Sequence, residues 1–219
     1  MLHVHRLVLV WLAGFALGAG VARAETAIPP FDLRDAPGSA AAAPAPPPDV
    51  ASLRPAPARD TLAALRALVA NEARHLGAEV CDTIARSVAR ASREHGIPSF
   101  LLVALIAQES GFDPSAENGG AIGLMQVRPF VARDYAERRG LRWRGEASLR
   151  DPAHNVQLAS GYLGELLDRF DSLDLALAAY NKGPEAVKRD LREDLTPRPR
   201  FVEDVLRRYE RYSERYGGI

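Results

Sequence analysis

The 219-residue sequence contains one cysteine and five histidines, and neither charge is in excess. With Cys81 alone the chain cannot form an internal disulfide bond, and a domain of this size can bury a sufficient core without one. The histidines, at positions 3, 5, 75, 95 and 154, lack the paired spacing of metal ligands beyond residue 24. We therefore expect neither a metal site nor a cofactor.

The charge balance also limits the class of partner. The 28 basic residues equal the 28 acidic residues, and the balance holds after the first sixty residues, where 23 of each sign remain. Nucleic-acid binding depends on clustered Lys and Arg side chains. The composition therefore argues against a nucleic-acid partner.

The single cysteine leaves two interpretations open. A lone thiol can serve as a nucleophile, but Cys81 shares a predicted helix face with Ile84 and Val88. A small buried apolar residue is therefore the favoured interpretation.

The first residues have the pattern of an export signal. A short basic segment, Met1–Arg6, precedes the apolar run Leu7–Val21 and the small-residue site Ala-Arg-Ala at 22–24. The run is shorter than the roughly 20 residues that a membrane-spanning helix needs. We expect a signal peptide over residues 1–24, cleavage after Ala24 and a periplasmic protein; an uncleaved inner-membrane anchor is the alternative.

A change in composition then separates a linker from a domain. Residues 25–59 hold nine of the sixteen prolines, and such a Pro/Ala-rich segment favours extended conformations over a packed core. We expect a disordered linker there, and one mostly α-helical domain over residues 60–219 with at most a small β element around Ile122–Val127. The helical patterns cover residues 60–76, 78–96, 98–110, 129–140, 151–170, 173–181 and 200–217.

The last of these patterns carries a stripe that is rich in aromatic residues. Its members are Phe201, Val205, Tyr209, Tyr212 and Tyr216. Their helical spacing favours packing against the core over a ligand platform.

Glu109 ends an almost entirely apolar helix pattern, Phe100–Ala107, and is followed by Ser110. Desolvation and the negative end of the helix dipole both disfavour the charged form of a carboxyl group in such a place. A raised pKa is what a general acid needs if it must hold a proton near neutral pH. An exposed carboxylate at a frayed helix end is the alternative that the segment alone leaves open.

Two further segments carry polar groups beside glycines. The segment GGAIGLMQV, residues 119–127, offers the Gln126 amide next to residues that permit close backbone approach. The segment ALAAYNKGP, residues 176–184, places Tyr180 and Asn181 at a helix end. Taken separately, the first indicates an ordinary turn and the second ordinary packing.

In order, the segments resemble the soluble lytic transglycosylase family, which has a goose-type-lysozyme-like fold. The matching motifs are Glu109-Ser110, then Gly-Leu-Met-Gln at 123–126, then Leu-x-Asp-Pro-x-x-Asn at 149–155 continuing to Tyr162-Leu163, and Ala-Tyr-Asn at 179–181. The resemblance covers roughly residues 84–195.

The resemblance implies a substrate and a set of roles. The substrate is peptidoglycan, cut at the β-1,4 bond between N-acetylmuramic acid and N-acetylglucosamine, with a 1,6-anhydro product. Glu109 carries over as the single catalytic acid and base, and Tyr180 as the residue that positions it. The remaining residues carry over to substrate binding: Ser110, Gly123, Leu124, Met125, Gln126, Tyr162 and Asn181.

Two alternatives stay open at this stage. A muramidase of the same fold would add water at C1 and would need a second carboxylate, for which Asp113 and Asp134 are nearest in sequence. A non-catalytic wall-binding component of an envelope secretion apparatus would not need a buried acid. We expect an enzyme that acts as a monomer.

Overall fold

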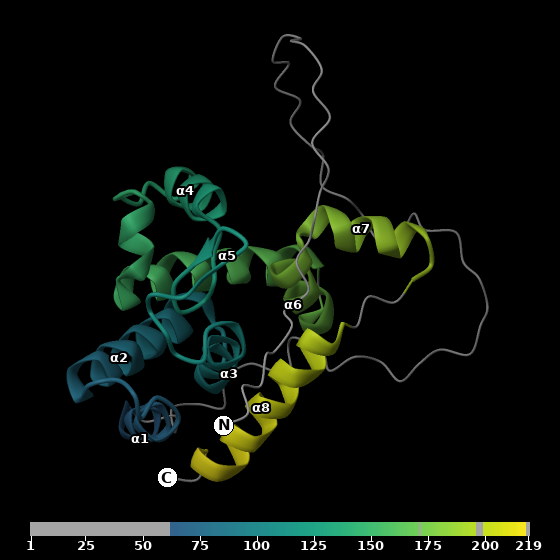
Figure 1. The fold of residues 1–219 in the computed structure, drawn as a ribbon. Helices are drawn as coiled ribbons and strands as arrows, with labels where there is room; N and C mark the ends of the chain where they lie inside the picture. Colours follow the sequence, from purple (N-terminus) through teal and green to yellow (C-terminus); the bar gives the residue numbers. More distant parts are fainter. Residues whose placement is uncertain (1–61, 171, 196–198, 218–219) are drawn as a thin grey trace, which may run out of the picture. The chain divides into compact units, whose positions relative to one another are not determined.

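The computed structural model describes residues 62–170, 172–195 and 199–217. The predicted signal peptide and linker, and the predicted domain start at Asp60, lie outside the described residues. The described chain is mostly helical, as the sequence predicts (Figure 1). Its helices are α1 (Leu62–Glu72), α2 (Ala78–His95), α3 (Ser99–Glu109), α4 (Pro129–Arg138), η3 (a 3-10 helix, Glu146–Arg150), α5 (Pro152–Phe170), α6 (Leu173–Lys182), α7 (Pro184–Arg192) and α8 (Arg200–Tyr216).

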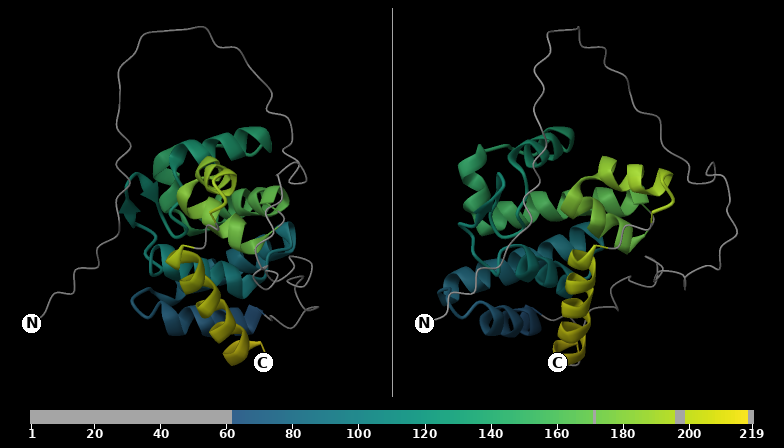
Figure 2. Two further views of the ribbon diagram at one scale, coloured as in Figure 1. Left: turned by 90° about the vertical axis from the view of Figure 1, so that its right-hand side faces the viewer. Right: turned by 45° about the vertical axis from the view of Figure 1, so that its right-hand side comes forward.

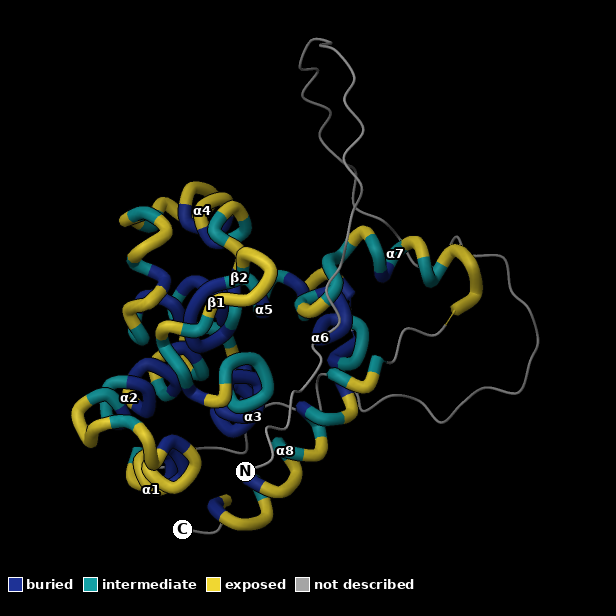
Figure 3. The backbone as a smooth tube through the Cα atoms, in the orientation of Figure 1, coloured by how far each residue is buried: buried dark blue, intermediate teal, exposed yellow. Residues whose placement is uncertain are grey.

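Helix α3 is the buried helix that the apolar run predicts. Its residues from Ser99 to Ile106 are all buried, and its last three residues are partly exposed (Figure 3). Helix α2 precedes α3 in the chain and packs against it. Gly96 caps the end of α2, and its φ of 67° is the left-handed conformation that glycine adopts at helix ends. Glu109 is therefore the last helical residue of a segment that the core surrounds.

The β element is small, as expected. Strands β1 (Glu117–Asn118) and β2 (Ala121–Ile122) form an antiparallel hairpin closed by Gly119 and Gly120, both with positive φ. An isolated bridge then pairs Ile122 with Val127. The loop between these two bridged residues contains the Gly-Leu-Met-Gln motif.

Helix α7 is absent from the sequence prediction. Its segment is strongly charged and contributes only Val187 to the buried residues, so it shows little of the apolar pattern that predicts a helix. Gly183-Pro184 ends α6 as predicted, but Pro184 is also the first residue of the next helix, a position where proline needs no hydrogen bond.

Helix α8 packs against α3 and α1, beside which it lies in both views of Figure 2. Val202, Val205, Tyr212 and Tyr216 are its buried residues, whereas Phe201 and Tyr209 are partly exposed. Two hydrogen bonds join the C-terminal part of α8 to α1. The Tyr212 hydroxyl donates to Glu72 at 2.7 Å, and Asn71 donates to the Tyr216 hydroxyl at 2.9 Å. The expectation that the stripe packs in the core is confirmed, with Val202 in place of Phe201.

The thiol of Cys81 is buried, which confirms the apolar interpretation of this residue. None of the helices in the described ranges is both long and apolar enough to cross a membrane. Within the same ranges, no three His, Cys, Asp or Glu side chains are grouped so as to hold a metal ion.

Candidate active site

Glu109 has the environment that its sequence position predicts. Its side chain is partly exposed, but the protein atoms around it remove enough water to raise its pKa from 4.5 to about 8. Burial is the cause of this shift, because no hydrogen bond or ion pair holds the carboxyl group within the described part of the chain. The carboxyl group therefore carries a proton at neutral pH.

Ser110 connects the end of α3 to the Gly-Leu-Met-Gln loop. Its hydroxyl donates to the Leu124 carbonyl at 2.8 Å and lies 3.3 Å from the Ile106 carbonyl, one turn back in α3. The residue that follows Glu109 thus bonds to the loop backbone.

The loop is also bonded from α5. Asn155 is fully buried, its Oδ1 accepts from the Met125 N–H at 2.9 Å, and its Nδ2 donates to the carbonyls of Ile122 and Leu149, each at 2.9 Å. The motif at 149–155 contained this residue, but the sequence analysis gave it no role. A buried amide in a helix with an apolar face was the signal, because buried polar groups are nearly always hydrogen-bonded.

Tyr180 reaches the same loop from α6. Its hydroxyl donates to the Met125 carbonyl at 2.7 Å, and its ring centroid lies 5.9 Å from that of Tyr162. Burial first, and then a charge on Glu109, raises the pKa of Tyr180 well above 10. Tyr180 is thus an electrostatic neighbour of Glu109, although no hydrogen bond joins the two in the described structure.

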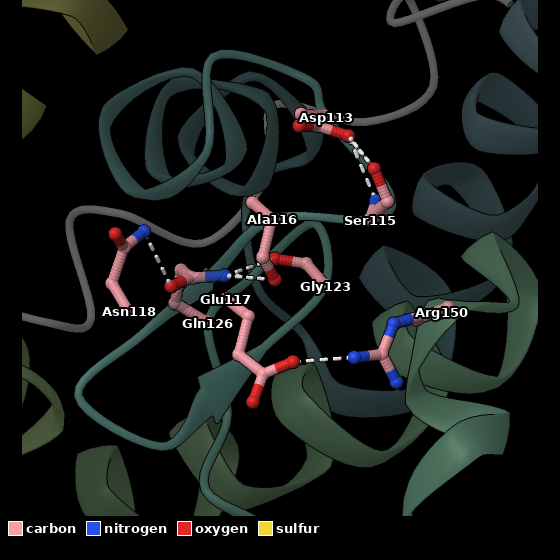
Figure 4. Close-up of polar contacts among 8 residues, drawn as sticks. All are labelled: Asp113, Ser115, Ala116, Glu117, Asn118, Gly123, Gln126 and Arg150. Carbon is pink, nitrogen blue, oxygen red and sulfur yellow. Dashed lines mark hydrogen bonds and ion pairs between the residues drawn. The ribbon is translucent and has the colours of Figure 1, made fainter.

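Gln126 points toward the protein rather than toward solvent. Its Nε2 donates to the carbonyls of Gly123 at 2.8 Å and Ala116 at 3.0 Å, and its Oε1 accepts from Asn118 at 3.1 Å (Figure 4). Both amide hydrogens are therefore used by backbone carbonyls, one in the loop and one just before β1. In this conformation Gln126 supports the loop, and its predicted contact with substrate can involve only the oxygen.

The remaining predicted binding residues divide between the core and the surface. Leu124 and Met125, which the resemblance assigns to substrate binding, have no exposed surface and belong to the buried core. Tyr162 is partly exposed, and Asn181 is exposed at the end of α6. The structure thus brings Ser110, the loop and Tyr180 into one hydrogen-bonded group, and Asn181 lies outside these bonds.

The two carboxylates weighed as partners of Glu109 are engaged elsewhere. Asp113 accepts from the Ser115 N–H at 2.8 Å and from its hydroxyl at 2.7 Å, and these bonds lower the pKa of Asp113. Asp134 is exposed on α4 and pairs with Arg138.

A separate surface hollow of about 440 Å³ lies between α2, α4 and α5, away from Glu109, which does not line it. Its charged lining includes Arg139, which already pairs with Glu165 at 3.0 Å. Within the described residues, the hollow has no cluster of side chains that could bind a metal ion, whereas burial raises the pKa of Glu109. Glu109 and the hydrogen-bonded residues near it are therefore the better candidate for an active site.

A protein-family model matches much of the chain. The model of the Transglycosylase SLT domain matches residues 86–199, more than half of the chain, and these residues contain α3, the loop, α5 and α6. The chain belongs to this family. All seven predicted binding residues, together with Glu109 and Tyr180, lie within the matched SLT segment.

Relatives with assigned names match the same region. Membrane-bound lytic murein transglycosylase C of Actinobacillus succinogenes is 37% identical over 118 residues, which is 49% of this chain and 33% of the relative. Endo-type membrane-bound lytic murein transglycosylase A of Klebsiella pneumoniae is 39% identical over 82 residues, 35% of this chain and 39% of the relative. This chain thus spans well under half the length of either. Protein IpgF of Shigella flexneri is 31% identical over 129 residues, 57% of this chain and 79% of IpgF.

Solved structures share the fold of this SLT domain. The lytic transglycosylase Slt of Pseudomonas aeruginosa superposes with a TM-score of 0.57 at 24% identity, covering 73% of this chain and 31% of Slt. The 70 kDa soluble lytic transglycosylase of Escherichia coli superposes with a TM-score of 0.56 at 22% identity, covering 75% of this chain and 32% of that protein. The predicted fold class, a mostly helical lysozyme-like domain, is thereby confirmed.

Proposed function

We propose that this protein is a peptidoglycan lytic transglycosylase in which Glu109 is the single catalytic acid and base. The observation that carries the proposal is the Glu109 carboxyl group, which burial keeps protonated at neutral pH beside the loop and Tyr180. Membership of the SLT family and the names of the relatives support the same activity.

The chemistry follows from one carboxyl group that changes its protonation state. Protonated Glu109 donates its proton to the glycosidic oxygen as the bond between N-acetylmuramic acid C1 and that oxygen breaks. The resulting carboxylate then accepts the proton of the muramic 6-hydroxyl, whose oxygen bonds to C1 and gives the 1,6-anhydro product. Glu109 regains its proton in the second step. The reaction therefore consumes no water and needs no second catalytic carboxylate.

The bonds of the two carboxylates nearest in sequence to Glu109 support this route over hydrolysis. Asp113 is bonded to Ser115, and Asp134 is paired with Arg138 on an exposed face. A hydrolase that uses two carboxylates needs the second one free to activate water or attack the sugar. The proposed site of action is the periplasm, reached through the signal peptide predicted over residues 1–24.

Product mass tests the proposed reaction directly. Digestion of purified sacculi, with mass spectrometry of the soluble fragments, is expected to give muropeptides with anhydro ends, because the acceptor is the sugar's own hydroxyl. A hydrolytic muramidase run in parallel provides fragments heavier by one water. Fragments of that heavier mass from this protein would show that it is a muramidase.

The pH dependence of activity tests the role of Glu109 as an acid. Because the pKa of Glu109 is about 8, the protonated form dominates below about pH 8, and kcat/KM is expected to fall tenfold for each pH unit above it. Turbidity assays on sacculi between about pH 5 and pH 10 measure this limb. A decline that begins near pH 4.5, the ordinary carboxyl value, would contradict the assignment.

A further inference from the structure

The surface hollow between α2, α4 and α5 lies on the other side of α5 from the candidate active site. The α5 residues of one helix face line it: Gln157, Gly161, Gly164 and Asp168. Asn155, which bonds to the loop, and Tyr162, whose ring lies beside that of Tyr180, are on roughly the opposite face of α5. The hollow is therefore distinct from the site around Glu109, and its volume of about 440 Å³ is within the range of small-molecule sites.

The Tyr135 hydroxyl is a buried polar group that faces this hollow. Tyr135 is only 4% exposed, and none of the described residues forms a hydrogen bond with its oxygen. That oxygen is nevertheless not sealed from solvent, and Tyr135 forms part of the wall of the hollow. Because buried polar groups are nearly always hydrogen-bonded, an open hydroxyl in this wall indicates a ligand that bonds to it.

Two glycines of α5 keep the hollow open next to this hydroxyl. A Cβ atom at Gly161 would lie 2.0 Å from the Tyr135 oxygen, so glycine allows the hydroxyl to lie directly against the backbone of α5. Gly164 follows one turn later, and a Cβ atom there would meet the Cβ of His95 at 3.6 Å. Side chains at either position would occupy the space beside the hydroxyl.

The charge of the hollow favours a cation. Three carboxylates line it, those of Glu94, Glu165 and Asp168, against the single guanidinium of Arg139. Glu165 is already paired, with Arg138 at 2.6 Å and with Arg139 at 3.0 Å. By contrast, no side chain in the described ranges forms an ion pair with Asp168.

Two helix ends add to this negative potential. Glu94 and His95 are the last two residues of α2, and Tyr135 lies in the last turn of α4. The C-terminal end of a helix carries the negative end of its dipole. Glu94 is exposed and has Arg90 at 3.7 Å. Burial lowers the pKa of His95, so its imidazole adds no positive charge at neutral pH.

An ammonium group fits these features better than a metal ion. Within the described residues, no three side chains of metal-binding type are grouped so as to hold an ion. A primary ammonium has three donors and no acceptor, which matches carboxylates and a hydroxyl oxygen. Leu141, a partly buried residue of the wall, offers an apolar contact for the aliphatic chain that carries the ammonium.

Going beyond the proposed function, we propose that the hollow is a second binding site, which takes the primary ammonium group of an amino acid or short peptide. The ammonium donates to the Tyr135 oxygen and to the exposed carboxylates of Glu94 and Asp168. The chain that carries it packs against Leu141. Because the hollow lies behind α5, its ligand does not compete with glycan at Glu109.

Two probes that differ by one ammonium group test the site. Nα-acetyl-lysine methylamide is expected to shift the NMR signals of the backbone amides of His95, Gly161 and Gly164 in the full chain, with a millimolar Kd. Nα-acetyl-norleucine methylamide has the same chain without the ammonium and should not shift them. Equal shifts with both probes, or no shifts with either, would overturn the proposal.

A second titration distinguishes the sources of the ammonium. Muropeptides that carry a free amine are compared with the same muropeptides after acetylation of that amine. Shifts at the same amides that disappear on acetylation assign the ligand to peptides of the cell wall. Binding of the lysine probe without binding of muropeptides assigns it to a free amino compound.

Tyr135→Phe tests the hydroxyl that points to the ligand. We expect it to weaken binding of the lysine probe about tenfold, because hydrogen bonds to charged groups are among the stronger ones. The substitution removes no hydrogen bond within the described structure, so urea unfolding should show no loss of stability. Undiminished binding by this variant would contradict the proposal.

Asp168→Asn tests the charge of the hollow and is expected to weaken binding of the lysine probe about threefold. Glu137→Gln is the matched control, because this exposed carboxylate on α4 pairs with Arg133 at 2.7 Å and does not line the hollow. It should leave binding unchanged. Equal losses in the two variants would mean that net charge alone attracts the probe, and the proposed site would be wrong.

Discussion

Replacement of Glu109 by Gln is expected to reduce lysis of purified sacculi by about 10²- to 10⁴-fold, the usual contribution of a general acid. The amide matches the carboxyl group in size but has no acidic proton to give to the glycosidic oxygen. Initial rates of turbidity loss and of release of anhydro muropeptides measure the effect. Unchanged lysis by a folded variant would contradict the enzymatic role and favour a wall-binding function.

The same substitution changes the pH dependence of stability in a defined direction. The pKa of Glu109 is about 8 in the folded chain against 4.5 ordinarily, so the unfolded state loses its proton first as the pH rises. The wild type therefore loses stability between pH 4.5 and about 8, while the amide does not titrate. Relative to the wild type, Glu109→Gln should gain about 3 kcal/mol of unfolding free energy between about pH 4 and pH 7. Urea unfolding at the two pH values measures the difference, and a constant difference would show that Glu109 is not desolvated.

The second large effect is expected at Gly123, where Gly123→Ala should destabilise the domain by at least about 3 kcal/mol. The residue has a φ of 81°, and a Cβ atom there would lie 2.2 Å from the Leu149 carbonyl oxygen and 2.4 Å from Nδ2 of Asn155. The substitution would therefore displace Asn155, which holds the loop, and the Leu149 carbonyl to which Asn155 bonds. Urea unfolding should show the loss of stability. Lysis should fall as well, because the hydrogen bond between the Tyr180 hydroxyl and the Met125 carbonyl would be disturbed.

Gly120→Ala is the matched control for this substitution. Gly120 has a nearly identical φ of 78°, but an added Cβ would meet no atom within 4 Å. Only the cost of the left-handed conformation remains, roughly 1 kcal/mol. Equal effects of the two substitutions would mean that conformation, and not close packing against Asn155, determines the requirement for glycine at 123.

Most helices follow from local patterns. The apolar periodicity of α2 and the nearly continuous apolar run of α3 predict a half-buried and a buried helix, and Gly96 predicts the boundary between them. Helix α7 is not predicted because its sequence is strongly charged and buries a single residue, Val187. Its position depends on contacts with α6, and a local sequence pattern does not predict such contacts.

The candidate site also has features that the sequence predicts and features that only the structure shows. A glutamate that ends a buried apolar helix is sufficient to predict a raised pKa, since desolvation depends on the apolar neighbours that the sequence itself displays. The direction of a polar side chain depends instead on which backbone groups lie within reach. The resemblance predicts that Gln126 binds sugar. In the structure it has a positive φ of 46°, and its amide hydrogens bond to the carbonyls of Ala116 and Gly123.

The sequence by itself determined the family motifs, the helical architecture and the acid character of Glu109, because each depends on the order and spacing of apolar and polar residues. Only the tertiary structure decided how the motifs are joined. The bonds from Ser110, Asn155 and Tyr180 all end on the backbone of one loop, and backbone groups have no sequence signature. Their partners become known only when helices distant in sequence are packed together.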